Sequence, residues 1–216
     1  MEEDLNFLRV KKIIFFIFLS LLLTSLLTSK SFSENFKLEK IIGLNEPWGS
    51  SFINKDEIII TEKSGKIKII NLISKKIKNV EHNLNFIEYG QGGLLDILYE
   101  KDNVWISYTE DRGNWKTSTS IAKSELNDKK LFFKNIFRAE PPIDSPYHFG
   151  SRLAIKDDYL FASAGERGKG MIAQDPTKHP GSIIRIYKDG SIPKDNPKFK
   201  NKNDWMPEIY QIGLRN

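Results

Sequence analysis

The sequence predicts an all-β fold: a β-propeller of four-stranded antiparallel blades, incomplete here, with about three blades and the start of a fourth. Two observations support this prediction. From residue 34 onward, short apolar runs rich in β-branched residues alternate with turn residues, as in antiparallel strands. Three of these segments also share one plan, in which small residues lead into an apolar strand, an acidic turn and a second apolar strand. No amphipathic helix longer than about two turns is needed in this region.

The strands are expected as a series of hairpins, each with a turn of polar residues or glycine between two apolar runs. The segment EIIITEKSGKIKIINL, residues 57–72, is the first of them. The predicted turns, in chain order, are Ser64-Gly65, Lys101-Asp102-Asn103, Asn127-Asp128, Asp157-Asp158 and Asp189-Gly190.

A loose internal repeat predicts the blades. The segments WGSSFINKDEIIITEK, GGLLDILYEKDNVWISYTE and GSRLAIKDDYLFASAGE align on Gly49, Gly93 and Gly150, and Gly213 opens a fourth unit. The glycines are 44, 57 and 63 residues apart, which are periods that fit propeller blades. A β-sandwich is the alternative, but it does not explain a glycine at the start of each unit. Because propellers typically close with about 4–8 blades, we expect this chain to be the N-terminal part of a longer protein.

Residues 1–33 are predicted to be a signal peptide. Basic residues between positions 9 and 12 precede the apolar run 13–27, which is shorter than the roughly 20 residues of a membrane span. Ser31 and Ser33 stand two apart, as signal-peptidase cleavage requires, so cleavage is expected after Ser33. An uncleaved N-terminal anchor is the alternative, and it would be the protein's one contact with a membrane. Residues 34–216 then form the propeller domain, in the periplasm or secreted.

The composition excludes several classes of function. The 216 residues include no cysteine, which excludes a disulfide framework, a cysteine metal cluster and a thiol nucleophile. The 33 basic and 28 acidic residues give a net charge of +5, which permits an anionic small molecule as ligand. Because the lysines and arginines are scattered, no nucleic-acid partner is expected. Any chemistry must therefore use histidine, carboxylates, arginine, amides or a bound cofactor.

Three loops look too constrained to be plain connections between strands. Gln91 lies between glycines in EYGQGGLLD, and His148 lies on a turn in PYHFGSRL. Arg215 and Asn216 end the segment IGLRN. These positions are comparable in the blade repeat, so we expect them to converge on one mouth of the central channel. By residue type, a neutral histidine can take a proton from an alcohol, arginine can polarise a carbonyl oxygen, and amides can orient a ligand. On these grounds His148 is either such a base or a turn residue bonded to the backbone.

Other polar residues are expected to have structural roles. His82 and His179 lie in segments typical of surface loops, without partners nearby in the sequence. The segment GERGKG lacks the strand–glycine–helix context of a phosphate loop. The tryptophans are expected to pack within blades, except that Trp115 is a candidate for an exposed loop residue. No metal site is predicted, because no EF-hand spacing exists and turn roles suffice for Asp144, Asp157, Asp158 and Asp175.

Nine segments follow one another in an order that is typical of one family. They are EPWGSSFI, IIITEKSGKI, GQGGLLDI, VWISYTE, HFGSRLAI, FASAGERG, AQDPTKHPGSIIRI, GSIPKDNP and EIYQIGLRN. The ordered set, which spans about residues 44–216, resembles the PQQ-dependent glucose/sorbosone dehydrogenase family, in particular its soluble aldose sugar dehydrogenase branch. No single segment is decisive, but the order is specific. The resemblance implies a six-bladed propeller, of which this chain is the N-terminal part.

The resemblance also implies roles for the candidate residues. His148 matches the histidine that removes the proton from the anomeric hydroxyl of the sugar as hydride passes to PQQ. Arg215 matches the arginine that contacts the reacting quinone oxygen, which makes it both catalytic and cofactor-binding. Asn216 matches a PQQ-binding asparagine, and Gln91 matches a glutamine that lines the pocket for substrate and cofactor. In the better-known glucose dehydrogenase branch an aspartate precedes the histidine, whereas Tyr147 stands here, so His148 has no acidic partner nearby in the sequence.

The resemblance therefore predicts an exported PQQ-dependent dehydrogenase that oxidises the anomeric hydroxyl of aldoses to lactones. A downstream quinone or cytochrome would accept the electrons. Calcium is the second cofactor implied, with ligands beyond Asn216, so the 216-residue chain alone is expected to be inactive. Two alternatives stay open: a non-catalytic exported propeller that binds sugars or cell-surface polymers, and a calcium-dependent lactone hydrolase of propeller fold. The metal-binding Glu/Asn/Asp set of such a hydrolase is not evident in the sequence.

Overall fold

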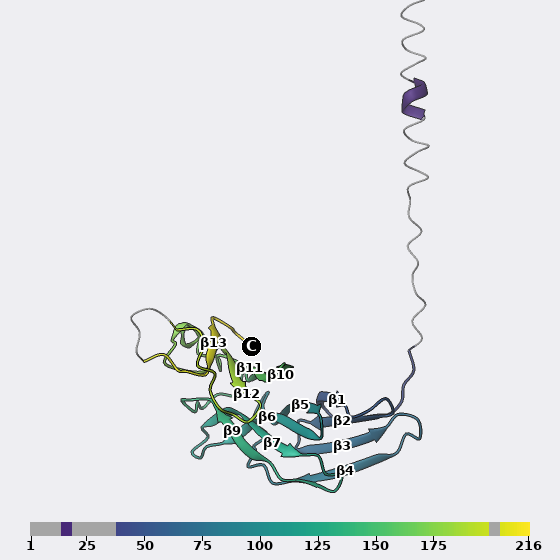
Figure 1. Ribbon diagram of the computed structural model, residues 1–216, viewed down its shortest axis with the longest axis horizontal. Coiled ribbons are helices and arrows are strands. Elements are labelled where there is room, and N and C mark those ends of the chain that lie inside the picture. The colour runs from purple at the N-terminus through teal and green to yellow at the C-terminus, as the bar shows by residue number, and fades with distance from the viewer. Residues whose placement is uncertain (1–13, 19–37, 199–203) are drawn as a thin grey trace, which may run out of the picture. The chain divides into compact units, whose positions relative to one another are not determined.

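The computed structural model describes residues 14–18, 38–198 and 204–216 (Figure 1). The chain divides into two compact units, Met1–Lys40 and Ile41–Asn216. In the first unit residues 14–18 are helical, and the rest of the predicted signal peptide, with its cleavage site after Ser33, lies outside the described residues. None of the helices within the described ranges has the length and apolar character that a membrane span requires.

The described part of the second unit folds into three sheets that follow one another along the chain (Figure 1). Each contains four sequential antiparallel strands, which is the arrangement of a propeller blade, so the predicted fold class is confirmed. The first sheet contains as its sequential antiparallel strands β1 (Pro47–Phe52), β2 (Glu57–Glu62), β3 (Lys66–Asn71) and β4 (Ile77–His82), and a short fifth strand, β8 (Lys130–Leu131), is added beside β4. The second consists of β5 (Leu94–Glu100), β6 (Asn103–Asp111), β7 (Thr117–Glu125) and β9 (Lys134–Arg138). The third consists of β10 (Gly150–Lys156), β11 (Tyr159–Ala164), β12 (Ser182–Tyr187) and β13 (Ile209–Ile212), with a short 3₁₀ helix η1 (Gly170–Gln174) between β11 and β12.

Three of the predicted turns join paired strands as expected: Ser64-Gly65, the turn that begins at Lys101, and Asp157-Asp158. The turn at Asn127-Asp128 has a different outcome. The strand after it, β8 (Lys130–Leu131), pairs in parallel with β4 of the first sheet. The chain then returns to the second sheet as β9, which pairs with β7. The prediction of a simple hairpin there is wrong, because β8 bridges two neighbouring sheets.

The prediction of a hairpin at Asp189-Gly190 is also wrong. The backbone N–H of Tyr187 donates to the carbonyl of Ser191 over 2.8 Å, but no strand follows within the described residues up to position 198. Pro193 and Pro197 explain this, since proline has no N–H to donate to a sheet. The partner of β12 is instead β13, more than twenty residues further along the chain.

Neighbouring residues of β6 face two different apolar cores. Val104 and Ile106 belong to a core that also includes Ile59 of β2, whereas Trp105 belongs to a core that includes Leu160 of β11. Side chains alternate across a strand, so the second sheet lies between the other two and shares one core with each. Full burial of each such large apolar side chain contributes about 1.5–3 kcal/mol. The packing therefore fixes the blades face to face.

The innermost strands β1, β5 and β10 carry a β-bulge at the same point, and β5 contacts both of the others. The bulges make Pro47, Leu94 and Gly150 structurally equivalent, because each is the residue that pairs just before the register shift. The blade repeat is thus real, but its alignment on Gly49, Gly93 and Gly150 is wrong by two residues in the first blade and one in the second. Gly49 instead allows close approach of β1 and β5, since a Cβ there would lie 2.7 Å from the Asp96 Cα. Gly213 follows β13, and none of the described residues after it forms a strand.

Candidate active site

The loops that lead into β5 and β10 lie against each other and bring two predicted site residues together. The N–H of Gln91 donates to the carbonyl of Pro146 over 2.8 Å. The Oε1 of Gln91 accepts from the N–H of His148, also over 2.8 Å. Since a backbone N–H can only donate, the amide oxygen of Gln91 must face His148, and its Nε2 group has no hydrogen-bond partner among the described residues.

The segment after β13 brings the other two predicted residues to the same place. Asn216 Oδ1 accepts from the N–H of Gly150 over 2.9 Å, at the start of β10. The carbonyl of Arg215 accepts from the N–H of Glu166 over 2.9 Å. The guanidinium of Arg215 is exposed and makes no hydrogen bond or ion pair with any described residue. All four predicted residues therefore gather at one end of the innermost strands.

A carboxylate that sequence reasoning missed completes the group. His148 Nδ1 lies 2.7 Å from Oε1 of Glu166, whose side chain is 7% exposed. The other carboxylate oxygen accepts from the N–H of Gly168 over 2.5 Å. Because a carboxylate only accepts hydrogen bonds, the proton on the ring resides on Nδ1 and the lone pair is on Nε2. The expectation that His148 lacks an acidic partner holds only for its sequence neighbours.

The hairpin at Asp157-Asp158 explains why Glu166 reaches His148. Gly150 at the start of β10 pairs with Ala164 at the end of β11. His148 precedes the first strand and Glu166 follows the second, so antiparallel pairing places both beyond the same end of the hairpin. Extending the predicted hairpin by two residues would have found this partner from the sequence.

Arg167 holds the loop that carries His148. Its Nε donates to the carbonyl of Tyr147 over 3.1 Å, and Nη2 donates to the carbonyl of Ser145 over 2.5 Å. Its backbone N–H donates to the carbonyl of His148 over 3.3 Å, and its guanidinium carbon lies 3.7 Å from the ring centroid of Phe149. His148 has a φ of 49°, in the left-handed region, so this network stabilises a backbone conformation that is unfavourable for histidine.

The charge on Arg167 is deeply buried. The residue is 2% exposed, and its remaining hydrogen bonds go to the carbonyl and hydroxyl of Thr117 on β7. Burial lowers the pKa of the guanidinium to about 10, with opposing contributions from Tyr89 and Asp144. Arg167 thus joins the second blade to the loop before the third blade, and it remains cationic at neutral pH.

The other two histidines have structural partners, and neither lies in a surface loop as predicted. His82 ends strand β4, and its Nε2 lies 2.8 Å from the carbonyl of Gly65. His179 is only 3% exposed, because it packs edge-on against Phe137 with ring centroids 5.0 Å apart. Its Nδ1 accepts from the N–H of Glu140, and its Nε2 lies 3.3 Å from the carboxylate of Glu208. The hydrogen bond from His179 lowers the pKa of Glu208.

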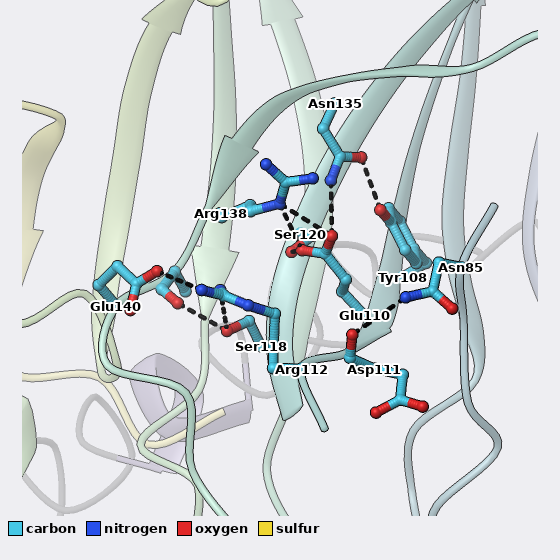
Figure 2. Close-up of polar contacts among 11 residues, drawn as sticks. Asn85, Tyr108, Glu110, Asp111, Arg112, Ser118, Ser120, Asn135, Arg138 and Glu140 are labelled. Atoms are coloured by element: carbon cyan, nitrogen blue, oxygen red, sulfur yellow. Dashed lines mark hydrogen bonds and ion pairs between the residues drawn. The ribbon is translucent and has the colours of Figure 1, made fainter. Parts of the chain in front are cut away.

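A second polar cluster surrounds Glu110 on β6 (Figure 2). Ser120 donates to Oε2 over 2.7 Å, Asn135 donates to Oε1 over 2.9 Å, and Arg138 Nε lies 2.8 Å from both oxygens. Tyr108 donates to Asn135 Oδ1 over 2.6 Å, and burial raises the pKa of this phenol to about 12. Both carboxylate oxygens are satisfied by donors on β7 and β9, the strands that follow β6 in the same sheet, so the cluster is structural.

No cluster of three or more potential metal ligands of the histidine, cysteine or carboxylate type occurs among the described residues. Of the aspartates for which turn roles were predicted, Asp175 bonds within its own turn, whereas Asp144 bonds to a residue of a distant loop. Asp144 accepts from the hydroxyl of Tyr89 over 3.0 Å. Asp175 accepts from the N–H and hydroxyl of Thr177, and from Lys178.

The fold and the site together define a β-propeller protein with a histidine–carboxylate pair beside exposed amides and an arginine at the ends of its innermost strands. The sequence matches the family model "Glucose / Sorbosone dehydrogenase" over residues 44–216. The chain belongs to this PQQ-dependent dehydrogenase family.

Named relatives agree with this assignment. An aldose sugar dehydrogenase of Escherichia coli is 31% identical over 186 residues, which cover 80% of this chain and 49% of the relative. The quinoprotein glucose dehydrogenase B of Acinetobacter calcoaceticus is 29% identical over 223 residues, covering 87% of this chain and 46% of the relative. The crystal structure of the soluble E. coli aldose sugar dehydrogenase in its apo form matches with a TM-score of 0.75 and 30% identity, over 80% of this chain and 52% of that one. The chain spans about half the length of the curated relatives it matches.

Proposed function

We propose that the protein is an exported PQQ-dependent sugar dehydrogenase that oxidises the anomeric hydroxyl of aldoses to the lactone. The observation that carries this proposal is the pair formed by His148 and Glu166, with Nδ1 and Oε1 2.7 Å apart. The pair leaves His148 Nε2 as a proton acceptor in a side chain that is 20% exposed, at the end of the blades where loops converge.

His148 acts as the general base in this proposal. Its Nε2 takes the proton of the anomeric hydroxyl while the hydrogen on the same carbon leaves as hydride, so that the C–O single bond becomes a C=O bond. The Nδ1 proton stays between the ring and Glu166, whose negative charge stabilises the imidazolium that forms. Glu166 therefore positions His148 and offsets its charge, and it takes no proton itself.

The donors around His148 suit an anionic quinone such as PQQ. Arg215 has an exposed guanidinium without a partner among the described residues, which can bind a carboxylate or a quinone oxygen. The engaged amide oxygens of Gln91 and Asn216 leave both NH₂ groups as donors. PQQ, when bound, would supply the two-electron acceptor for the hydride. In support, the relative from Acinetobacter calcoaceticus is named a quinoprotein.

The finer parts of the proposal follow the resemblance of the sequence. Calcium is expected as a second cofactor, with ligands beyond Asn216, and a downstream quinone or cytochrome is expected to reoxidise the enzyme. We expect residues 1–216 alone to be inactive, because the curated relatives are about twice as long as the matched region. The apolar N-terminal segment supports export to the periplasm or the medium.

The proposal is tested by loading the full-length protein with PQQ and calcium and measuring dye reduction with a panel of aldoses. We expect lactone formation with at least one aldose, and its loss in His148→Ala. His82→Ala is the control, since His82 contacts Gly65, Leu84 and Phe86 and none of the predicted site residues. Absence of activity on every aldose, or full activity of His148→Ala, would refute the proposal. Titration with PQQ, followed by absorbance, separates a dehydrogenase from a propeller that only binds sugars.

A further inference from the structure

A groove beside the outer strands of the second sheet has no role in the chemistry proposed above. Its volume is about 510 Å³, and three lysines line it: Lys123 on β7, Lys130 on β8 and Lys134 on β9. Asn103, which also lines it, begins β6 after the turn that follows β5, whereas the loop of Gln91 precedes β5. The groove therefore lies at the opposite end of this sheet from the candidate active site. We call it the lysine groove.

Two of these lysines place like charges directly opposite each other. Lys123 and Lys134 are cross-strand partners in the pairing of β7 with β9, so their side chains leave the same face of the sheet. Like charges in this arrangement destabilise a sheet. Neither ammonium group forms an ion pair with another residue of the described ranges, and that of Lys123 lies 5.2 Å from the ring centroid of Trp105. An anion bound in the groove would therefore relieve the repulsion between the two lysines.

Phe132 presents an apolar ring beside these charges. The residue is 65% exposed, whereas its neighbours Leu131 and Phe133 are buried in the core that the first two sheets share. Asn83 accepts from the N–H of Phe133 over 2.8 Å and donates to its carbonyl over 3.1 Å, so the backbone is anchored and holds the ring of Phe132 outward. The ammonium of Lys130 lies 5.3 Å from the centroid of this ring. A cation and an apolar surface are thus side by side at the groove.

We propose that the lysine groove binds the phosphate of an anionic phospholipid headgroup, with the ring of Phe132 buried among the lipids. Each lysine ammonium offers a positive charge and three donors to a phosphate. An exposed aromatic ring among lysines suits the surface of an anionic membrane, because the ring enters the lipid while the ammonium groups contact the headgroups. A small soluble phosphate would satisfy the lysines but leave the ring of Phe132 in water.

This membrane contact goes beyond the proposed function and does not depend on it. It is additional to the contact that the sequence predicts for an uncleaved N-terminal segment. Because the lysine groove and the candidate active site lie at opposite ends of the second sheet, a protein bound through the groove keeps the site open to soluble sugars.

Two carboxylates share the groove and make its charge testable. Glu125 and Asp189 both line it. Asp189 Oδ1 accepts from the N–H and the hydroxyl of Ser191 over 2.9 and 2.6 Å, so this carboxylate is engaged in its own turn. Glu125 is exposed, and its carboxylate has no hydrogen bond or ion pair within the part of the chain that the structure describes. Its charge opposes that of a bound phosphate, so its removal should strengthen binding.

The first test places a reporter at the groove of the full-length protein. Phe132→Trp keeps an aromatic ring at this exposed position, and we expect its emission to shift to the blue on vesicles that contain phosphatidylglycerol. Vesicles of pure phosphatidylcholine should produce little shift. The wild type, with its four tryptophans, gives the baseline. Tyr210→Trp, at a 41% exposed position on β13, is the matched control and should show no shift. All variants keep the same N-terminal segment, so any binding by that segment is common to them.

The second test changes the charge of the groove in the Phe132→Trp background. Each lysine near an anionic membrane contributes about fivefold in affinity, so Lys123→Gln and Lys134→Gln together should raise the vesicle concentration at half-maximal shift about 25-fold. Glu125→Gln should lower that concentration. Lys169→Gln, which removes an exposed lysine outside the groove, should leave it unchanged.

Three results would overturn the inference. The first is the absence of a blue shift for Phe132→Trp on vesicles that contain phosphatidylglycerol. The second is a shift that persists at the same vesicle concentration when both Lys123 and Lys134 are replaced. The third is binding of glycerol phosphate, measured by calorimetry, without any shift on vesicles, because the groove would then bind a soluble phosphate ester and not a lipid.

Discussion

His148 and Glu166 form a direct pair, with Nδ1 of the ring 2.7 Å from Oε1 of a carboxylate that is almost fully buried. The two residues are 18 positions apart in the sequence and meet because they lie beyond the same end of one hairpin. The pair assigns the ring proton to Nδ1, and this determines which nitrogen can act as the base.

Glu166→Gln should lower kcat while leaving substrate binding nearly intact. Glutamine keeps the size of the side chain but removes the charge that stabilises an imidazolium, so we expect kcat to fall by about 10²-fold or more. The KM should change by less than about threefold, because the amide still fills the same space. Steady-state kinetics of the full-length protein check this. Glu88→Gln, on the neighbouring loop, is the matched control, and equal kcat values for the two variants would contradict the pair's role.

Arg167→Met should destabilise the fold strongly. The variant removes a buried cation and leaves the carbonyls of Ser145, Tyr147 and Thr117 without their donor, so we expect the free energy of unfolding to fall by about 2–4 kcal/mol. Urea denaturation followed by circular dichroism measures this difference. Lys169→Met removes an exposed cation two residues away and should stay within about 0.5 kcal/mol of the wild type. A similar loss in both variants would show that burial of Arg167 is not the cause.

Local hairpins could be predicted from the sequence, whereas long-range pairings could not. The turns at Ser64-Gly65 and Asp157-Asp158 are set by the residues within them and their apolar neighbours, and both form as predicted. The parallel pairing of β8 with β4 and the antiparallel pairing of β13 with β12 depend on segments far apart in the chain. No local pattern encodes such pairings. The glycine alignment also failed, because Gly49 and Gly150 are required by different close contacts.

In the candidate site, too, some features could be predicted from the sequence and others could not. The convergence of Gln91, His148 and the segment ending at Asn216 followed from a repeat that was only approximately aligned, and the structure brings these residues together. Sequence reasoning missed Glu166 because it considered an acidic partner for His148 only among the sequence neighbours of His148, whereas Glu166 lies across the hairpin. His179 looked like a surface residue because the surrounding prolines and lysine are polar-loop signals, yet the end of the second blade covers it.

The free energy of unfolding should decrease at acidic pH, in part because Glu208 becomes protonated. Its pKa is lowered by the hydrogen bond from His179, so its contribution is fully present above the unfolded-state value of about 4.3. That contribution is lost as the pH falls through the lower pKa of the folded state. Glu208→Gln should therefore unfold with a weaker pH dependence below about pH 4.3. Thermal melts between pH 3 and 7 measure this, with the exposed Glu125→Gln as control; if the acid limb of Glu208→Gln matches the wild type, the pair is not linked to stability.

Glu110 should contribute to the stability of the second blade and should have no role in the oxidation of the sugar. Glu110→Ala leaves Ser120, Asn135 and Arg138 without their common acceptor, and we expect a loss of about 2–3 kcal/mol in the free energy of unfolding. Tyr108→Phe removes only one bond at the edge of the cluster and should cost about 1 kcal/mol. The two residues are coupled through Asn135, so the double variant should lose less than the sum of the single variants. Urea denaturation of the four proteins completes the cycle, and strict additivity would show that Asn135 does not transmit the effect.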